Sequence, residues 1–154
     1  MQIPKTPAGK LNEASLHGLV GYQLAQAAIT TTAVFEQLAN EVQSVRPVEF
    51  TLLCLIAENP MVSSARLAKA LAVTKPNITM WVDRLESRGL VARRQSDTDK
   101  RSIELKVTRA GSNLAKTVRQ GLLHREAMAL RTLSAAEKGM LLELLHRVAS
   151  SRSA

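Results

Sequence analysis

Aromatic residues, cysteines and long apolar runs are all scarce in this sequence of 154 residues. The aromatic residues are Tyr22, Phe35, Phe50 and Trp81. The core must therefore consist mainly of Leu, Ala, Val, Ile and Met, which favours helices. The single cysteine, Cys54, excludes an internal disulfide and is typical of a cytoplasmic protein. Because no run reaches about 18 apolar residues, no transmembrane helix is predicted, and residues 1–15 lack the apolar segment of a signal peptide.

Sequence motifs for chemistry are also missing. The sequence contains no phosphate-binding loop, no grouping of a nucleophile with a base and no metal-binding motif. His17, His124 and His146 are far apart, so only folding or dimerisation would bring them to a metal. We therefore expect no catalytic residues, no metal and no cofactor, and the sequence does not predict an enzyme.

Positive charge is plentiful, with a formal net charge of +8 at pH 7. Such a charge favours a polyanionic partner, nucleic acid before an anionic membrane, although a soluble protein can also simply be basic. The Lys and Arg residues are spread over several predicted elements. This distribution argues against a basic amphipathic membrane helix.

Apolar residues recur at helical spacing through most of the chain. The pattern predicts helices over residues 15–40, from Pro47 to the Asn59-Pro60 stop, and beyond Thr108, which can cap a long helix. A capping box, Ser134 with Glu137, precedes a strongly apolar final helix.

Two short helices are predicted in the centre of the chain. Ser63 or Ser64 can cap the first, "SSARLAKAL", and Thr74 the second, "KPNITMWVDRLESRG", which ends at Gly89. A turn of a few residues joins them, as in a helix-turn-helix, whose second helix enters the DNA major groove. An ordinary helix pair with solvated charges is the alternative.

The solvent side of the second helix carries side chains suited to DNA. Asn77 can bond adenine, and Thr and Met side chains can contact a thymine methyl group. Lys75 and Arg84 suit phosphates. Directly after this helix, "LVARR" and "SIELKV" read as two strands joined by a polar loop. A hairpin in this place is the wing of a winged helix, and Arg93, Arg94 and Lys100 are expected to contact phosphates.

Residues 67–111, "LAKALAVTKPNITMWVDRLESRGLVARRQSDTDKRSIELKVTRAG", resemble the multiple-antibiotic-resistance regulator (MarR) family of bacterial transcription factors. The resemblance extends over about residues 15–150. It implies a homodimeric winged-helix repressor or activator whose wings reach the minor groove. Arg101 matches the family's wing-tip arginine and Asp99 the wing aspartate that orients a basic side chain. Met80 departs from the family, since many members have arginine there.

The predicted fold is mainly α with a small β-hairpin, a winged helix-turn-helix with N- and C-terminal dimerisation helices. We expect a flexible arm over 1–14, dimerisation helices over 15–45 and 112–150, and the DNA-binding region over 46–111, in one compact domain. The apolar final helix favours burial against a second copy, with packing inside one chain as the alternative. The candidate DNA contacts are Ser64, Thr74, Lys75, Pro76, Asn77, Thr79, Met80, Arg84, Arg94, Asp99, Lys100 and Arg101.

Family members often bind small aromatic acids or phenols, and His17, Tyr22 and Arg46 are the candidate ligand residues here. Arg46 can pair with a carboxylate. Alternatively, Tyr22 belongs to the core while His17 and Arg46 are solvated. Cys54 is interpreted as a small buried apolar residue. The predicted function is a repressor that binds a pseudo-palindromic operator and is released by an aromatic effector; an effector-independent architectural DNA-binding protein is the alternative.

Overall fold

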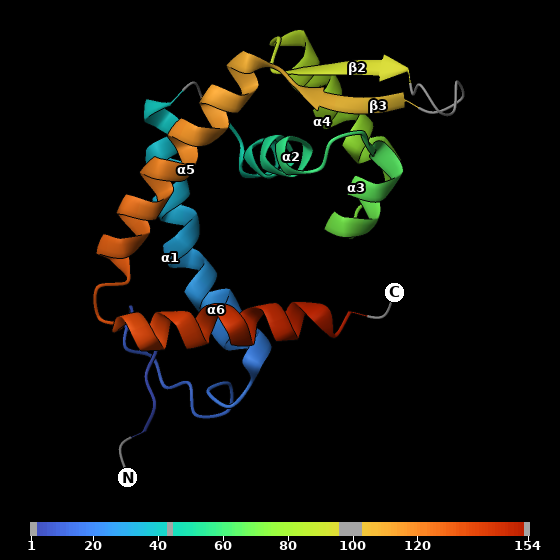
Figure 1. Cartoon of the computed structure of the whole chain (residues 1–154). Helices are drawn as coiled ribbons and strands as arrows, with labels where there is room; N and C mark the ends of the chain where they lie inside the picture. The colour runs from blue at the N-terminus through green and yellow to red at the C-terminus, as the bar shows by residue number, and fades with distance from the viewer. Residues whose placement is uncertain (1–2, 43–44, 96–102, 153–154) are drawn as a thin grey trace. The chain divides into compact units, whose positions relative to one another are not determined.

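The computed structural model describes residues 3–42, 45–95 and 103–152 (Figure 1). The chain forms two compact units. One comprises Met1–Val34 and Leu123–Ala154, and the other comprises Phe35–Leu122. We call them the terminal unit and the central unit.

The described residues form six helices and three strands, which confirms the predicted winged-helix fold class. In chain order they are α1 (Val20–Glu41), α2 (Pro47–Glu58), β1 (Val62–Ser63), α3 (Ser64–Leu71), α4 (Lys75–Ser87), β2 (Val91–Gln95), β3 (Ile103–Val107), α5 (Arg109–Ala129) and α6 (Ala135–Ser150). The boundary between the two units therefore falls inside α1 and α5.

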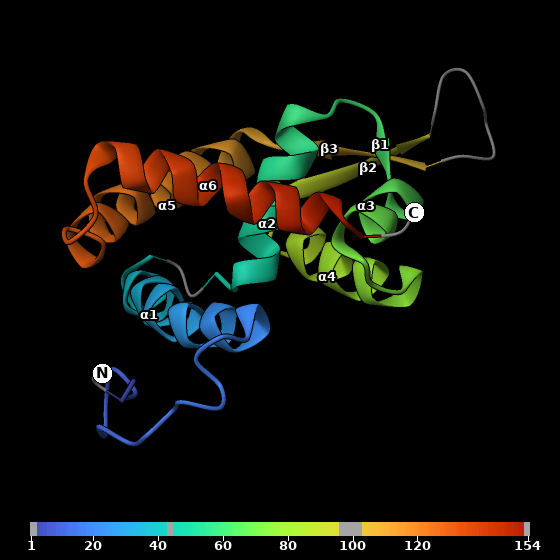
Figure 2. The ribbon, with the colours of Figure 1, turned by 90° about the horizontal axis from the view of Figure 1, so that it is seen from below.

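The sheet contains one strand more than the sequence predicts. Its order is β1-β3-β2, and both pairings are antiparallel (Figure 2). In the wing, Val91 lies opposite Val107 and Gln95 lies opposite Ile103. Strand β1 has only two residues, too few to show the alternation by which strands are recognised in a sequence.

Local capping fixes the ends of α3 and α4. Ser63, rather than Ser64, caps α3, and its hydroxyl accepts the N–H of Arg66 at 3.3 Å. Thr74 occupies the N-cap position of α4 as predicted, but its side chain makes no capping hydrogen bond. Gly89 follows α4 with a φ of +66°, a left-handed conformation that glycine adopts at little steric cost.

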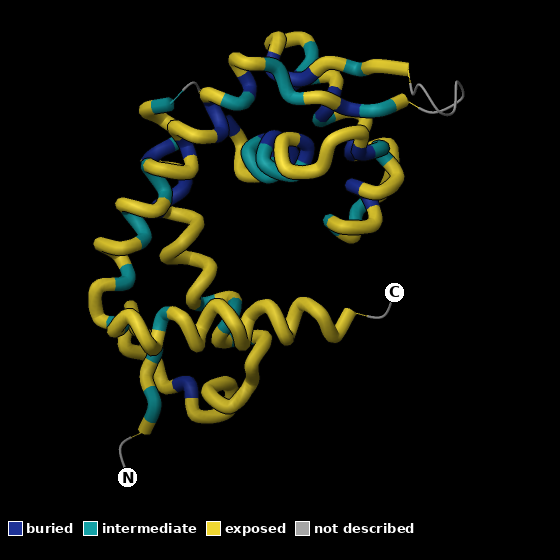
Figure 3. Tube along the Cα trace, in the orientation of Figure 1, coloured by how far each residue is buried: buried dark blue, intermediate teal, exposed yellow. Residues whose placement is uncertain are grey.

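The hydrophobic core lies in the central unit and holds α4 in one orientation. Ile78, Val82 and Leu85 have no exposed surface, and their spacing places them on one side of the helix. They pack in a core cluster with residues of α2, α3 and the sheet, where Figure 3 shows most of the buried positions. The opposite side of α4 must therefore face outward.

The start of α5 is fixed against the base of the wing. The Thr108 hydroxyl donates to the Gly89 carbonyl at 2.7 Å and accepts the Gly111 N–H at 3.1 Å, as expected of the predicted cap. A side chain on Gly111 would meet the Leu90 carbonyl oxygen at 2.1 Å. Glycine at this position allows the backbones to approach closely.

In the terminal unit, α1 begins at Val20, five residues later than the helix expected from Ser15. The preceding segment forms turns in which the N–H groups of Leu16 and His17 donate to the Glu13 carbonyl. Gly18 lies between these turns and α1, and glycine disfavours a continuous helix. Residues 3–14, expected as a flexible arm, carry local hydrogen bonds and the buried Glu13.

Candidate nucleic-acid interface

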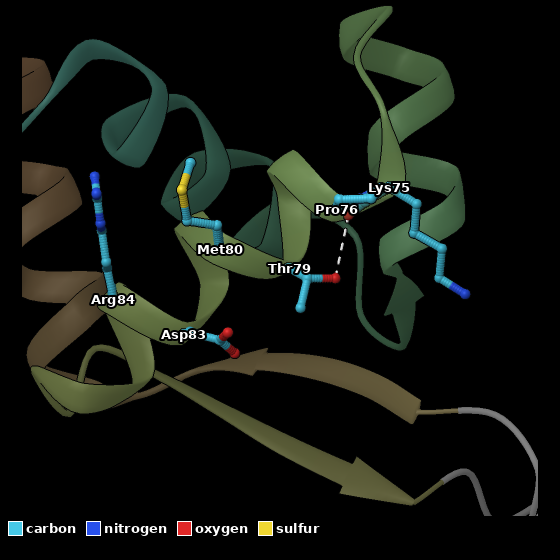
Figure 4. Close-up of a pocket in the computed structure, with 6 residues that line it drawn as sticks. All are labelled: Lys75, Pro76, Thr79, Met80, Asp83 and Arg84. Carbon is cyan, nitrogen blue, oxygen red and sulfur yellow. Dashed lines mark hydrogen bonds between the residues drawn. The ribbon is translucent and has the colours of Figure 1, made fainter.

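The outward side of α4 forms an open hollow of about 650 Å³ (Figure 4). Two rows of side chains at i, i+4, i+8 spacing line it, as a helix requires. These lining residues are Lys75, Thr79 and Asp83 in one row and Pro76, Met80 and Arg84 in the other. Positively charged side chains thus stand at both ends of the hollow, and apolar groups lie between them.

Two polar groups that line the hollow, the Thr79 hydroxyl and the Asp83 carboxylate, already have partners in the protein. The Thr79 hydroxyl donates to the Lys75 carbonyl at 3.1 Å (Figure 4). This bond one turn back along the helix satisfies the hydroxyl donor and is common for threonine in helices. The Asp83 carboxylate accepts from the Arg93 guanidinium of β2.

Arg93 connects the wing to α4. Its guanidinium donates to Asp83 and to Glu86, which both lie on the helix. The hydrogen bond that Arg93 donates to Asp83 is the main cause that raises the pKa of Arg93. Donors of Arg93 are thus directed at two carboxylates within the protein, and the expected contact of Arg93 with phosphates stays a prediction. Its role in this structure is to fix the wing relative to α4.

A buried carboxylate also fixes the C-terminal end of α4. Glu49 is 4% exposed and accepts the backbone N–H of Arg46 at 3.0 Å and a guanidinium N–H of Arg88 at 3.3 Å. A buried charge requires such partners. The ion pair joins the first turn of α2 to the C-cap residue of α4.

The predicted DNA contacts that the structure describes lie mostly on exposed surface. Thr74, Lys75, Pro76, Asn77, Thr79, Met80 and Arg94 are exposed, whereas Ser64 and Arg84 are half-buried. Arg94 lies on β2 opposite Glu104. Asp99, Lys100 and Arg101 are outside the described residues.

Two of the three predicted ligand residues contact Glu13, which was not among the predicted site residues. Glu13, which is 6% exposed, accepts the Tyr22 hydroxyl at 2.7 Å and lies 3.2 Å from Nδ1 of His17. The Tyr22 hydrogen bond lowers the pKa of Glu13, and Glu13 in turn raises the pKa of Tyr22. The i, i+4 spacing of Glu13 and His17 was the available signal. Arg46 is exposed and belongs to the central unit.

Cys54 is half-buried, and burial raises the pKa of its thiol. A raised pKa lowers the fraction of reactive thiolate, which fits the interpretation as an apolar residue. Within residues 3–42, 45–95 and 103–152, no group of three or more His, Cys, Asp or Glu side chains is arranged to hold a metal. No helix in these ranges is long and apolar enough to span a membrane.

A helix-turn-helix followed by a two-stranded wing, with a core that turns one side of the second helix outward, defines a winged-helix DNA-binding protein. The model of the MarR family matches residues 45–103. A putative transcriptional regulatory protein for the hcr operon of Thauera aromatica is 31% identical over 139 residues, which are 90% of this chain and 84% of the relative.

Two solved structures show the same fold. The transcriptional repressor CouR, bound to a 23-mer DNA duplex, superposes with a TM-score of 0.82 at 29% identity over 90% of this chain and 98% of CouR. Bordetella bronchiseptica BpsR, whose DNA binding is regulated by 6-hydroxynicotinic acid, has a TM-score of 0.79 at 21% identity over 89% of this chain and 97% of BpsR. The chain belongs to the MarR family of DNA-binding transcriptional regulators, which are not enzymes.

Proposed function

We propose that this regulator is a homodimeric repressor that binds a pseudo-palindromic operator and is released by a small aromatic acid. The observation that carries the proposal is the outward side of α4, whose orientation is set by Ile78, Val82 and Leu85 and which presents Lys75 and Arg84 around an apolar hollow. A helix with this exposure and charge fits the major groove of DNA.

The individual DNA contacts follow from position and chemistry. Lys75 and Arg84 bind phosphates on either side of the groove, and Asn77 bonds an adenine edge. Ser64, Thr74 and Arg94 bind further phosphates. Arg101 enters the minor groove of an adjacent segment, with Asp99 and Lys100 beside it.

Dimer formation is supported by α6, which the structure describes along its whole length and which buries none of its residues (Figure 3). Its exposed apolar side chains are Met140, Leu141, Leu142, Leu144, Leu145 and Val148. A soluble protein rarely exposes so many neighbouring apolar side chains without a partner. A second copy of the chain would cover them through a self-complementary interface.

For the effector, we propose that the carboxylate of an aromatic acid replaces Glu13 as the partner of His17 and Tyr22, which lie together on the Glu13 carboxylate in the free chain. BpsR, a relative in fold, is regulated by 6-hydroxynicotinic acid. Arg46, the third candidate, lies in the central unit and is proposed separately as a residue that can pair with a carboxylate. An architectural protein without an effector would bind DNA equally with and without such acids.

Electrophoretic shifts and footprints on the DNA upstream of the gene test the proposal. We expect a two-fold-related footprint that one of a panel of aromatic carboxylates, including 6-hydroxynicotinic acid, releases. Light scattering on the free protein should give the mass of a dimer. A monomer at micromolar concentration, or a footprint without two-fold symmetry, contradicts the repressor proposal, and a footprint that no acid alters favours the architectural alternative.

A further inference from the structure

The hollow on α4 has an unusual chemical composition for a surface that faces DNA. Its middle consists of the Pro76 ring, the Thr79 side chain and the Met80 thioether (Figure 4). Met80 is 43% exposed, and among the described residues of the central unit only Met61 and Ile103 are other large apolar side chains with comparable exposure. An apolar side chain therefore stands exposed on the face of α4 that the core directs outward.

The polar groups beside these side chains are directed away from a ligand in the hollow. The Thr79 hydroxyl donates to the Lys75 carbonyl, so the methyl group of Thr79 is the part left to the hollow. Asp83 points toward the wing strands, where Arg93 binds it. The carboxylate that would otherwise accept from a cytosine amino group is thus neutralised by the protein itself.

An apolar hollow between two cations fits a specific feature of duplex DNA. In the major groove the only apolar group that a standard base pair presents is the C5-methyl group of thymine. Lys75 and Arg84 at the two ends would hold the phosphates on either side of that groove. Asn77, which does not line the hollow, would then be the residue that recognises a base edge by hydrogen bonds.

We propose that Pro76, Thr79 and Met80 form a methyl-reading site that selects thymine at one or two positions in each half of the operator. The inference rests on the proposed operator binding by α4 and names the chemistry of that contact. Each methyl group buried in the hollow should contribute about fourfold in affinity, the equivalent of about 0.8 kcal/mol for one buried carbon.

The test removes methyl groups from the DNA and from the protein separately. A high-affinity duplex is first selected from random sequence with the whole protein, and each thymine is then replaced in turn by deoxyuridine, which lacks only the methyl. We expect the wild-type protein to lose about fourfold in affinity at one or two positions per half-site. At the same positions, 5-methylcytosine should be bound more tightly than cytosine, because it restores only the methyl.

Protein variants separate direct contact from an effect on DNA shape. Thr79→Ser removes the methyl and keeps the hydroxyl, and Met80→Gln replaces the apolar end by an amide. At the position that each side chain reads, the variant should bind thymine and deoxyuridine duplexes equally. Thr51→Ser is the matched control, because the Thr51 hydroxyl makes the same backward bond, 2.9 Å to the Pro47 carbonyl, and does not line the hollow.

The outcomes distinguish the inference from the proposed function. If a sequence is selected but deoxyuridine changes nothing at any position, the methyl-reading site is wrong and operator binding stands. A thymine preference that persists unchanged in both variants would also overturn it, because DNA shape would be the cause. If no sequence is enriched at all, the proposed operator binding fails and the inference fails with it.

Discussion

The central and terminal units differ in how far a single chain completes them. The whole hydrophobic core cluster lies between Phe35 and Leu122, and it includes side chains without any exposed surface. In the terminal unit, by contrast, α6 is amphipathic in sequence yet has no buried residue. The difference teaches that the DNA-binding unit carries its own core, whereas the terminal unit requires a further surface to bury its apolar side chains.

The largest expected effect comes from charging the apolar face of α6. The double substitution of Leu144→Asp and Val148→Asp, whose side chains are 47% and 49% exposed in the single chain, should convert the dimer to a monomer. Because two linked DNA-binding units gain affinity from each other, operator affinity should fall by about 100-fold or more. Light scattering and electrophoretic shifts measure the two effects.

Ser150→Asp is the control for this experiment, since it adds negative charge to the polar side of the same helix. It should leave the mass and the operator affinity of the protein nearly unchanged. If the double variant remains a dimer with normal affinity, α6 is not the interface, and the contrast between the two units needs another explanation.

The next prediction compares a glycine of the central unit, Gly111, with a glycine of the terminal unit, Gly139. Gly111→Ala would place Cβ 2.1 Å from the Leu90 carbonyl oxygen and 2.8 Å from Cγ2 of Val107, which is overpacking against backbone. It should lower the free energy of unfolding by about 1–3 kcal/mol. Gly139 in α6 has no atom within 4 Å of that position, so Gly139→Ala should raise the free energy of unfolding by about 0.5–1 kcal/mol.

Chemical denaturation of both variants makes this comparison. If Gly111→Ala has the same free energy of unfolding as the wild type, α5 does not approach the base of the wing as closely as the structure shows. A destabilised Gly139→Ala protein would show that a partner covers this position in the dimer, which sharpens the map of the interface.

A smaller effect is expected when the wing is released from α4. Arg93→Gln leaves Asp83 and Glu86 without their counter-ion beside the DNA surface. Operator affinity should fall on the order of tenfold because these carboxylates then repel phosphates. The stability of the central unit should change by less than about 1 kcal/mol, since the ion pairs are partly exposed.

The double variant Asp83→Asn, Glu86→Gln provides a background that distinguishes a positioning role of Arg93 from a direct contact of Arg93 with phosphate. In that background Arg93→Gln should have little further effect on operator affinity, as measured by electrophoretic shifts at fixed salt. A full loss in the same background would mean that Arg93 contacts DNA directly, as the sequence alone suggested.

The features that the sequence predicted well depend on local signals. Thr108, Gly89 and the pair of Ser134 with Glu137 act over one helical turn, and the structure places each at the helix end expected of it. Strand β3 followed from the alternation in Ile103–Val107, and β2 followed from its place as the segment that pairs with it across the polar loop. These patterns, with the family resemblance, were sufficient for the fold class and the orientation of α4.

The features that were missed depend on contacts across the fold. The partners of Arg93 lie seven and ten residues earlier on α4 and are reached only because β2 folds back along the helix. The burial of Glu13 requires turns that delay the start of α1. No periodicity in the sequence carries the contacts of Arg93 with α4, and for Glu13 the only signal was its i, i+4 spacing from His17.

The smallest effect concerns the pair of Glu13 and Tyr22 in the terminal unit. The Tyr22 hydroxyl lowers the pKa of Glu13 below its ordinary value of 4.5, so the folded protein favours the charged carboxylate. The stabilisation is therefore fully present above about pH 4.5 and is lost as the pH falls through the lowered pKa. Tyr22→Phe should reduce the melting temperature at pH 7. Its difference in melting temperature from wild type should shrink at lower pH, as Glu13 becomes protonated in both proteins.

Thermal unfolding from pH 7 down to pH 3 measures this difference, and Glu13→Gln supplies the control background. With glutamine at position 13, Tyr22→Phe should cause a change that does not depend on pH, because no carboxylate remains to be stabilised. If the difference between Tyr22→Phe and wild type is the same at every pH, the hydroxyl does not act on the Glu13 charge. Tyr22 would then contribute through packing alone, and its contact with Glu13 would not depend on the carboxylate charge.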